Sequence, residues 1–390
     1  MSCDFARNPL YFTDEHRMFR DSVRAFVERE IAPHVDAWDE AGRIPRELYR
    51  RAGELGLLGL GFPEAFGGTP ADAFHKLIYA EELARAGSGG VQAALGSLNI
   101  ALPPLVDAGD AALQAEVLPA VLAGEKIAAL AITEPGGGSD VAGLATRAVR
   151  DGDHYVVNGD KVFITSGLRA DVLMVAVRTD PETRGARGIS LLLIDGDTPG
   201  LEKTELKKMG WWASDTAQLR FVDCRVPASR LVGPAHGGFG LVMHNFNAER
   251  MNIAIMAYSY AAVCYDEALA WARARNTFGV PLVERQVIRH KLMDMAMRID
   301  ATRALAHELA YAIEHNVGSG AERVARICLL KNLATQTMQF CADQAVQMLG
   351  GMGYMRGSKC ERIYREAKVL MIGGGAEEIM KDLAARQLGL

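Results

Sequence analysis

The stretch Thr133-Glu-Pro-Gly-Gly-Gly-Ser-Asp140 marks the point at which the residue pattern changes from helical to strand-like. Its glycines free the backbone to approach a ligand, and its hydroxyl and N–H groups suit an anion or a polar ring edge; the same residues also fit a plain connecting loop. Before this stretch, Thr13 is placed to cap a helix. Four segments there carry apolar residues at helical spacing: residues 14–31, 48–58, 74–86 and 113–122.

After this stretch, β-rich runs alternate with polar turns as far as about residue 235. Asn158-Gly159 predicts a hairpin over residues 154–165, because this pair is the strongest short turn signal. Three more strands are predicted: residues 172–177, 189–194 and 216–222. Strands do not alternate with helices, so a parallel βαβ sheet is not expected. The chain also lacks the motifs of Rossmann, P-loop, α/β-hydrolase and zinc-protease sites.

Helical spacing returns beyond residue 236 and predicts a four-helix bundle. The predicted helices are residues 237–276, 286–316, 321–349 and 377–387. The fold class is therefore α+β, with an N-terminal helical domain (1–129), a central antiparallel, barrel-like β-domain (130–236) and a C-terminal helical bundle (237–390).

Composition excludes several classes of protein. The 390 residues are 49% hydrophobic and 23% charged, which is typical of a globular protein of two or three domains. A net charge of −5 provides no basic field for nucleic acid or an anionic membrane. The six cysteines, Cys3 among them, are scattered and support neither a disulfide scaffold nor a zinc site. Residues 1–10 show no targeting leader, and no apolar segment is long enough to span a membrane, so a cytoplasmic protein is predicted.

Three further segments suit a ligand, although each also has a purely structural interpretation. Arg275-Asn-Thr-Phe278-Gly279, with Gln286 soon after, suits a phosphate contact or an exposed arginine. The segment from Gln347 through Gly350 and Gly351 allows close backbone approach or simply ends a helix. The glycines at 373–375 form a second such strip or a flexible turn.

Taken together and in order, these segments resemble the acyl-CoA dehydrogenase family along essentially the whole chain. Residues 131–140 resemble its first signature and residues 361–368 its second. Residues 208–216 and 221–227 fit its β-domain. The resemblance implies a helix–sheet–helix subunit, a homotetramer and bound FAD. It also implies oxidation of an acyl-CoA to the trans-2-enoyl-CoA, with electrons passing to electron-transferring flavoprotein.

The resemblance also assigns roles to individual residues. Ile132 and Thr133 are expected at the flavin pyrimidine edge, Ser139 near the pyrophosphate and the CoA chain, and residues 163–165 over the flavin face. The set that binds FAD, partly that of a neighbouring subunit, is Ala131, Ile132, Thr133, Ser139, Phe163, Ile164, Thr165, Arg275, Phe278, Gln286, Gln347, Gly350, Gly351, Ala376, Glu377 and Glu378. The set expected at the substrate is Ser139, Asn247, Arg250, Gly374 and Gly375.

Dehydrogenation requires a base for the substrate's α-proton, and the resemblance indicates where that base lies. Many members carry it at the position of Gly374, which has no side chain here. Members similar to the isovaleryl- and long-chain-type enzymes carry it just before an arginine on the first bundle helix, where this chain has Glu249 and Arg250. Glu249 is therefore predicted as the base. The glycine at 374 is expected to leave room for a branched or longer acyl chain.

Three alternatives stay open at this stage. A flavin oxidase or monooxygenase of the same fold would react rapidly with oxygen. A dehydrogenase of acyl groups on a carrier protein would prefer pantetheine-protein thioesters to CoA thioesters. A non-catalytic flavin-binding subunit of a mixed tetramer would fit the missing side chain at Gly374, but not the carboxylate of Glu249. The pattern does not indicate acyl chain length, branching or electron acceptor.

Overall fold

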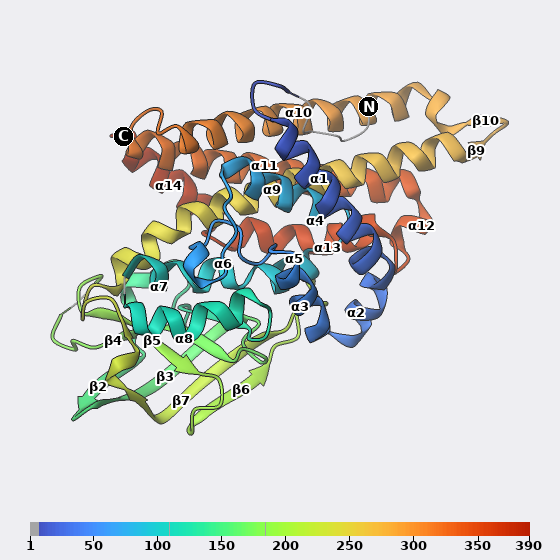
Figure 1. The fold of residues 1–390 in the computed structure, drawn as a ribbon. Helices are drawn as coiled ribbons and strands as arrows, with labels where there is room; N and C mark the ends of the chain where they lie inside the picture. The colour runs from blue at the N-terminus through green and yellow to red at the C-terminus, as the bar shows by residue number, and fades with distance from the viewer. Residues whose placement is uncertain (1–7, 109, 184) are drawn as a thin grey trace. The chain divides into compact units, whose positions relative to one another are not determined.

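The computed structural model describes residues 8–108, 110–183 and 185–390 (Figure 1). Cys3 and most of residues 1–10, where no targeting leader is predicted, lie outside the described residues. The chain divides into two compact units. The helical unit comprises the described residues up to Ala37, with Ala71–Gln92 and Glu249–Leu390, and the sheet unit comprises Trp38–Pro70 and Ala93–Ala248. Within the described ranges, no helix is long and apolar enough to cross a membrane.

The sheet unit is built on a mixed sheet with the strand order β6-β7-β3-β2-β4-β5-β8, in which β1 also pairs with β4. The strands are β1 (Ala128–Ala131), β2 (Arg147–Asp151), β3 (His154–Thr165), β4 (Val172–Arg178), β5 (Ile189–Asp195), β6 (Leu201–Glu205), β7 (Thr216–Pro227) and β8 (Leu231–Val232). Most neighbours are antiparallel, as predicted, but β4 pairs in parallel with β1 and, at one position, with β2. The short, almost fully buried Ala128–Ala131 segment is typical of a parallel strand.

The hairpin predicted at Asn158-Gly159 is wrong. The strand β3 runs straight through this pair, and the turn lies instead at Gly152, between β2 and β3. Gly159 has a φ of +143°, and a Cβ at this residue would lie 2.7 Å from the Cα of Thr146. The pairing of β3 with β7 shifts register between Val157 and Gly159, so the glycine marks a bulge and a close approach of backbone.

The helices of the sheet unit are short, and three helices lead from one unit to the other. Within the unit lie α3 (Arg46–Glu54), α6 (Leu98–Ala101), α7 (Pro103–Ala108) and α8 (Ala111–Leu122). The connecting helices are α2 (Val35–Ala41), α5 (Gly89–Gly96) and α9 (Gly238–Ala274). The helix predicted over residues 48–58 ends early, because Gly56 adopts a left-handed φ of +70°.

The helical unit confirms the predicted bundle and adds two helices to its C-terminal part. Its helices are α1 (Asp14–Phe26), α4 (Ala73–Ala84), most of α9, α10 (Gln286–Glu314), α11 (Gly320–Leu349), α12 (Gly351–Tyr354), α13 (Lys359–Ile372) and α14 (Glu377–Gln387). The helix α11 packs against α10, α13 and α14. Most of α13 was predicted only as the second signature, residues 361–368, and not as a helix. The strands β9 (Asn276–Thr277) and β10 (Val280–Pro281) form a hairpin that projects between α9 and α10 (Figure 1).

Candidate active site

Glu249 lies on α9, beside Arg250. Its side chain keeps some accessible surface, but protein atoms surround the carboxyl closely enough that desolvation raises its pKa to about 7. The positive charges of Arg250 and Lys331 act in the opposite direction and lower this pKa. A carboxyl group with a pKa near neutrality changes protonation state easily at physiological pH, which is the property required of a general base.

The glycine strip, residues 373–375, joins α13 to α14 and is fixed by two cationic side chains. Arg250 donates from Nε to the carbonyl oxygen of Gly374 at 3.0 Å. Lys331 donates from Nζ to the carbonyl oxygens of Met371 at 3.1 Å and Gly375 at 2.7 Å. Sequence analysis missed Lys331, because a lysine in an amphipathic helix is usually exposed, whereas this residue has no accessible surface.

Gly374 does not leave the free volume that was expected from its missing side chain. A Cβ at this position would lie 2.7 Å from Cδ1 of Ile253 and 3.8 Å from Cγ of Arg250. Ile253 on α9 therefore fills the space that a larger residue would need. The φ of Gly374 is +67°, a conformation that favours glycine.

Glu377 and Glu378 follow the strip at the start of α14. Glu377 accepts hydrogen bonds at Oε1 from Gln336 at 2.5 Å and from Lys381 at 2.9 Å. Its pKa lies below the ordinary value, chiefly because of the hydrogen bond from Lys381. Asn332 donates to the main-chain oxygen of Glu377 at 2.9 Å, while Glu378 is exposed. Ala376, which caps the helix, is half-buried.

In the sheet unit, the loop around Thr133 is anchored by a buried ion pair. Lys161 has no accessible surface and donates from Nζ to Oε1 of Glu134 at 2.8 Å and to the carbonyl oxygen of Ile132 at 2.9 Å. Glu134 also accepts from the N–H groups of Ala145 and Thr146. Burial lowers the pKa of Lys161 to about 8, although Glu134 opposes the shift. The loop is thereby held firmly against β3, an arrangement that sequence analysis did not predict.

The predicted flavin-contact residues of the sheet unit differ in exposure. Ala131 and Ile132 point into the core, so that only their main chain is available to a ligand. Thr133 and Thr165 are half-buried, and Ser139 is exposed. Of the other predicted contacts, Phe163 is 69% exposed with a φ of +61°, whereas Ile164 is 2% exposed and packs in the sheet core.

The predicted FAD contacts at the β9–β10 hairpin, at the start of α10 and at the end of α11 are exposed. Arg275 and Phe278 lie at the hairpin β9–β10, where Phe278 is 98% exposed. Gln286 begins α10 and is exposed as well. The exposed junction of α11 and α12 contains Gln347, Gly350 and Gly351. These surfaces are open to a ligand or a second chain. Asn247 is half-buried and lies in the part of α9 that belongs to the sheet unit.

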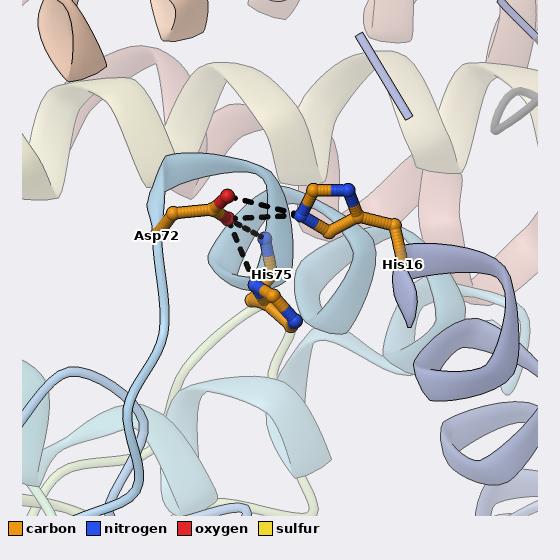
Figure 2. A group of neighbouring side chains, drawn as sticks. All are labelled: His16, Asp72 and His75. Atoms are coloured by element: carbon orange, nitrogen blue, oxygen red, sulfur yellow. Dashed lines mark hydrogen bonds and ion pairs between the residues drawn. The ribbon is translucent and has the colours of Figure 1, made fainter. Parts of the chain in front are cut away.

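The structure also brings His16 close to two other potential metal ligands that are distant from it in sequence, Asp72 and His75 (Figure 2). Their ligand atoms lie within 4.8 Å of one another. Nδ1 of His16 accepts a hydrogen bond from the N–H of Thr13 at 3.1 Å, which assigns the ring proton to Nε2. That nitrogen donates to Oδ2 of Asp72 at 3.0 Å. A metal ion would require the same nitrogen without its proton.

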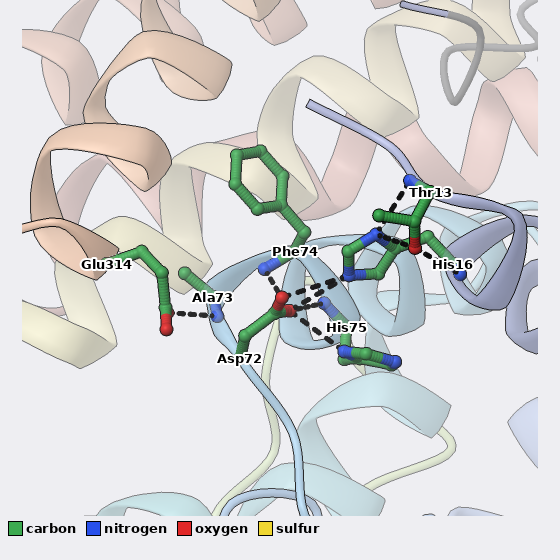
Figure 3. A network of polar contacts seen from close by, with 7 residues as sticks. All are labelled: Thr13, His16, Asp72, Ala73, Phe74, His75 and Glu314. Carbon is green, nitrogen blue, oxygen red and sulfur yellow. Dashed lines mark hydrogen bonds and ion pairs between the residues drawn. The ribbon is translucent and has the colours of Figure 1, made fainter. Parts of the chain in front are cut away.

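Helix capping accounts for this cluster (Figure 3). Asp72 is the N-cap of α4 and accepts from the N–H groups of Phe74 and His75, both at 2.9 Å. Thr13 and His16 form the capping box of α1. The Asp72–His16 contact therefore joins the N-termini of two packed helices, α1 and α4. We assign the cluster to stability rather than to metal binding.

Comparison with known proteins gives a consistent result along the chain. Residues 13–125, 129–224 and 236–389 match the N-terminal, middle and C-terminal domain models of acyl-CoA dehydrogenases. The mitochondrial long-chain specific acyl-CoA dehydrogenase of Sus scrofa is 38% identical over 97% of this chain and 87% of its own length.

Solved structures agree. A putative acyl-CoA dehydrogenase from Mycobacterium smegmatis has a TM-score of 0.94 and 47% identity, over 97% of this chain and 99% of its own. A glutaryl-CoA dehydrogenase of the same organism in complex with FADH2 has a TM-score of 0.91 and 26% identity, over 98% and 96% of the two chains.

Proposed function

The chain belongs to the acyl-CoA dehydrogenase family, and we propose that Glu249 is the base with which it oxidises an acyl-CoA to the trans-2-enoyl-CoA. The protein is an FAD-dependent oxidoreductase that acts on an acyl-CoA. The observation that carries the assignment of the base is the surrounded carboxyl of Glu249, whose pKa is raised to about 7 by desolvation. Arg250 and Ile253, on the same helix, contact the glycine strip.

The residues proposed to bind FAD have the exposure and chemistry that this cofactor needs. A Cβ at Gly136 would meet no atom within 4 Å, so the backbone of the 133–140 loop is open to a diphosphate. The exposed ring of Phe163 offers a surface for a flat heterocycle. We propose that Thr133, Ser139 and Thr165 add hydroxyl groups, and that Ala131, Ile132 and Ile164 contribute through their main chain.

The reaction removes a proton and a hydride from the acyl-CoA. The α C–H bond of the acyl-CoA is a weak acid, and its proton passes to a carboxylate oxygen of Glu249. The β-hydrogen leaves with its electron pair, and bound FAD supplies the acceptor for this hydride. Because its pKa is raised to about 7, Glu249 can take up and release a proton near neutral pH. Negative charge that develops on the thioester oxygen needs hydrogen-bond donors.

The acyl-CoA is proposed to contact Ser139, Asn247, Arg250, Gly374 and Gly375. Arg250 is buried and donates through Nε to the strip, and we propose that its positive charge supports the acyl-CoA. Ile253 limits the space beside Gly374. The side chain of Ile253 is therefore proposed to shape the acyl pocket, in place of the free volume expected from the glycine.

We further propose a homotetramer that passes electrons to electron-transferring flavoprotein. The exposed Arg275 and Phe278 at the β9–β10 hairpin, together with Gln286 and residues 347–351, are free to contact the FAD of a neighbouring subunit. Ala376, Glu377 and Glu378 are proposed to complete that contact. Division of the chain at residues 129 and 236 and a cytoplasmic location remain predictions.

Anaerobic titration of the purified protein tests this function. Acyl-CoA thioesters of graded length and branching are expected to bleach the yellow flavin. Matched thioesters of a carrier protein are expected to bleach it weakly. Well-folded protein that lacks FAD, or that contains stoichiometric NAD, would contradict the proposal. Rapid reoxidation of the bleached flavin by air would favour an oxidase.

A further inference from the structure

Lys331 is a buried cation whose position is not explained by an ion pair. It lies near the middle of α11 and has no accessible surface. Its Nζ donates to two main-chain oxygens, those of Met371 and Gly375, and among the described residues no carboxylate lies within salt-bridge distance of it. Burial of an ammonium group without a carboxylate partner is costly, and desolvation lowers the pKa of Lys331 to about 8.

The two oxygens that Lys331 binds flank the glycine strip in sequence: Met371 lies two residues before it, and Gly375 is its last residue. The oxygen of Gly374 between them accepts from Arg250. Side chains of two helices, α11 and α9, therefore hold the strip. Asn332, the residue after Lys331, extends this attachment to the oxygen of Glu377. Loss of Lys331 would release two of these backbone contacts at once.

The groups that face Glu249 are mostly positive. Arg250 approaches from α9 and Lys331 from α11, and both oppose the desolvation that raises the pKa of Glu249. Cys328, also on α11, faces both cations, and burial raises the pKa of its thiol, which keeps it neutral. Glu377 of α14 faces Lys331 but is bonded to Lys381 and Gln336. Two cations thus favour the ionised carboxylate.

We propose that Lys331 is a positioning residue of the dehydrogenation, which holds the glycine strip in place and keeps Glu249 ionised near neutral pH. The inference rests on the proposed role of Glu249. Lys331 touches neither the α-proton nor the hydride in this scheme. It acts through the backbone of the strip and through its charge. A neutral hydrogen-bond donor at this position would keep the attachment to the strip and lose the positive charge, so the two effects can be separated by experiment.

The pH dependence of flavin reduction tests the inference. Wild-type, Lys331→Gln and Lys331→Met proteins are mixed anaerobically with saturating acyl-CoA between pH 5.5 and 9, after FAD occupancy is measured. In Lys331→Gln the midpoint of the acid-side limb, where the rate rises as Glu249 ionises, is expected to move up by roughly one pH unit, because a nearby opposite charge is worth about that much or more. The rate should fall about tenfold at pH 6 and recover near pH 9.

The other variants separate positioning from charge. Lys331→Met removes both functions, so its plateau at high pH should also fall below that of Lys331→Gln. Lys331→Arg keeps the charge, so its midpoint should equal that of wild type. This variant still tests the inference if Lys331→Gln or Lys331→Met folds poorly. Lys76→Gln, at an exposed lysine of the same unit, should match wild type throughout. An unshifted midpoint in Lys331→Gln, or a shifted midpoint in Lys331→Arg, would overturn the inference.

Failure of the proposed role of Glu249 would give a different result from failure of the Lys331 inference. If Glu249 is not the base, Glu249→Gln will reduce its flavin at the wild-type rate. If Glu249 is the base but Lys331 only fills space, Glu249→Gln will be inactive. In that case Lys331→Gln will lose the same fraction of its rate at every pH.

Discussion

A methyl group added at Gly374 should destabilise the protein in a way that depends on Ile253. The Cβ of Gly374→Ala would lie 2.7 Å from Cδ1 of Ile253. Overpacking of this kind costs about 1–3 kcal/mol. The left-handed φ of +67° adds about 1–2 kcal/mol for a residue with a Cβ. The expected loss in the free energy of unfolding is therefore about 2–5 kcal/mol.

Removal of Cδ1 by Ile253→Val should cancel the overpacking and leave the backbone strain. The cost of Gly374→Ala should fall to about 1–2 kcal/mol in that background. Ile253→Val by itself should cost about 0.5–1.5 kcal/mol. The double-mutant cycle should therefore show a coupling of about 1–3 kcal/mol between the two positions.

Equilibrium urea unfolding of the FAD-bound protein, followed by circular dichroism, measures this coupling. Gly240→Ala on α9 is the control, because its Cβ would meet open space and no positive φ is required. It should stabilise the helix by about 0.4–1 kcal/mol. Strictly additive effects of Gly374→Ala and Ile253→Val would refute the claim that Ile253 occupies the space beside the strip.

The same geometry constrains relocation of the base. Glu249→Gly combined with Gly374→Glu places the carboxylate at the family's commoner position, where the new side chain meets Ile253. Partial recovery of flavin reduction over Glu249→Gly is expected once Ile253→Val is added, with selectivity moved toward shorter, straight acyl chains. Equal recovery without Ile253→Val would contradict this reasoning.

Three further changes have defined outcomes. Asp72→Ala should lower the free energy of unfolding by about 1–3 kcal/mol, more than the N-cap variant Asp110→Ala in the sheet unit, because Asp72 also binds two histidines. Desolvation alone would raise the pKa of Asp72, but hydrogen bonds from His75 and His16 lower it. The stability that the ionised carboxylate adds is therefore present above about pH 4 and is lost as the pH falls through its folded pKa. A stability difference between wild type and Asp72→Ala that widens as the pH falls in a urea-unfolding series would contradict this. Lys161→Met should release the Thr133 loop and raise the Kd for FAD at least tenfold, measured by flavin fluorescence, whereas the exposed Lys207→Met should not; equal Kd values would show that the buried pair is dispensable. Arg275→Ala should weaken FAD retention and tetramer stability together, measured by absorbance and light scattering, and full FAD occupancy in an Arg275→Ala monomer would contradict the proposed contact.

Sequence patterns predicted the order and type of most elements, because long amphipathic helices and alternating strands carry a strong periodic signal. Thr13 was correctly predicted as the first cap, and the bundle helices begin and end close to the predicted residues. The hairpin at Asn158-Gly159 failed for a tertiary reason. The close approach of Thr146 requires glycine at 159, and this requirement looks like a turn signal when the neighbouring strand is unknown.

The site was predictable only in part. The resemblance indicated Glu249 and its neighbour Arg250, but Lys331, the second cation that lowers the pKa of Glu249, lies on another helix. Lys161 and Lys331 are both fully buried and both bind carbonyl oxygens at loops assigned to ligands. Neither residue stands out in sequence, because a lysine among apolar residues at helical or strand spacing is ordinarily exposed. The space beside Gly374 depends on a contact between α9 and the glycine strip that no local pattern encodes.

The most direct test of the account is the rate of flavin reduction in Glu249→Gln. This change preserves the shape of the side chain and removes its ability to accept the α-proton. FAD and acyl-CoA binding should survive, and Glu267→Gln on the same helix, where the carboxylate pairs with Lys359, serves as the matched control. Stopped-flow mixing with a reactive acyl-CoA should show a rate lower by roughly 10²–10⁴ in Glu249→Gln and near wild type in the control. Reduction of the Glu249→Gln flavin at the wild-type rate would show that this carboxylate is not the base.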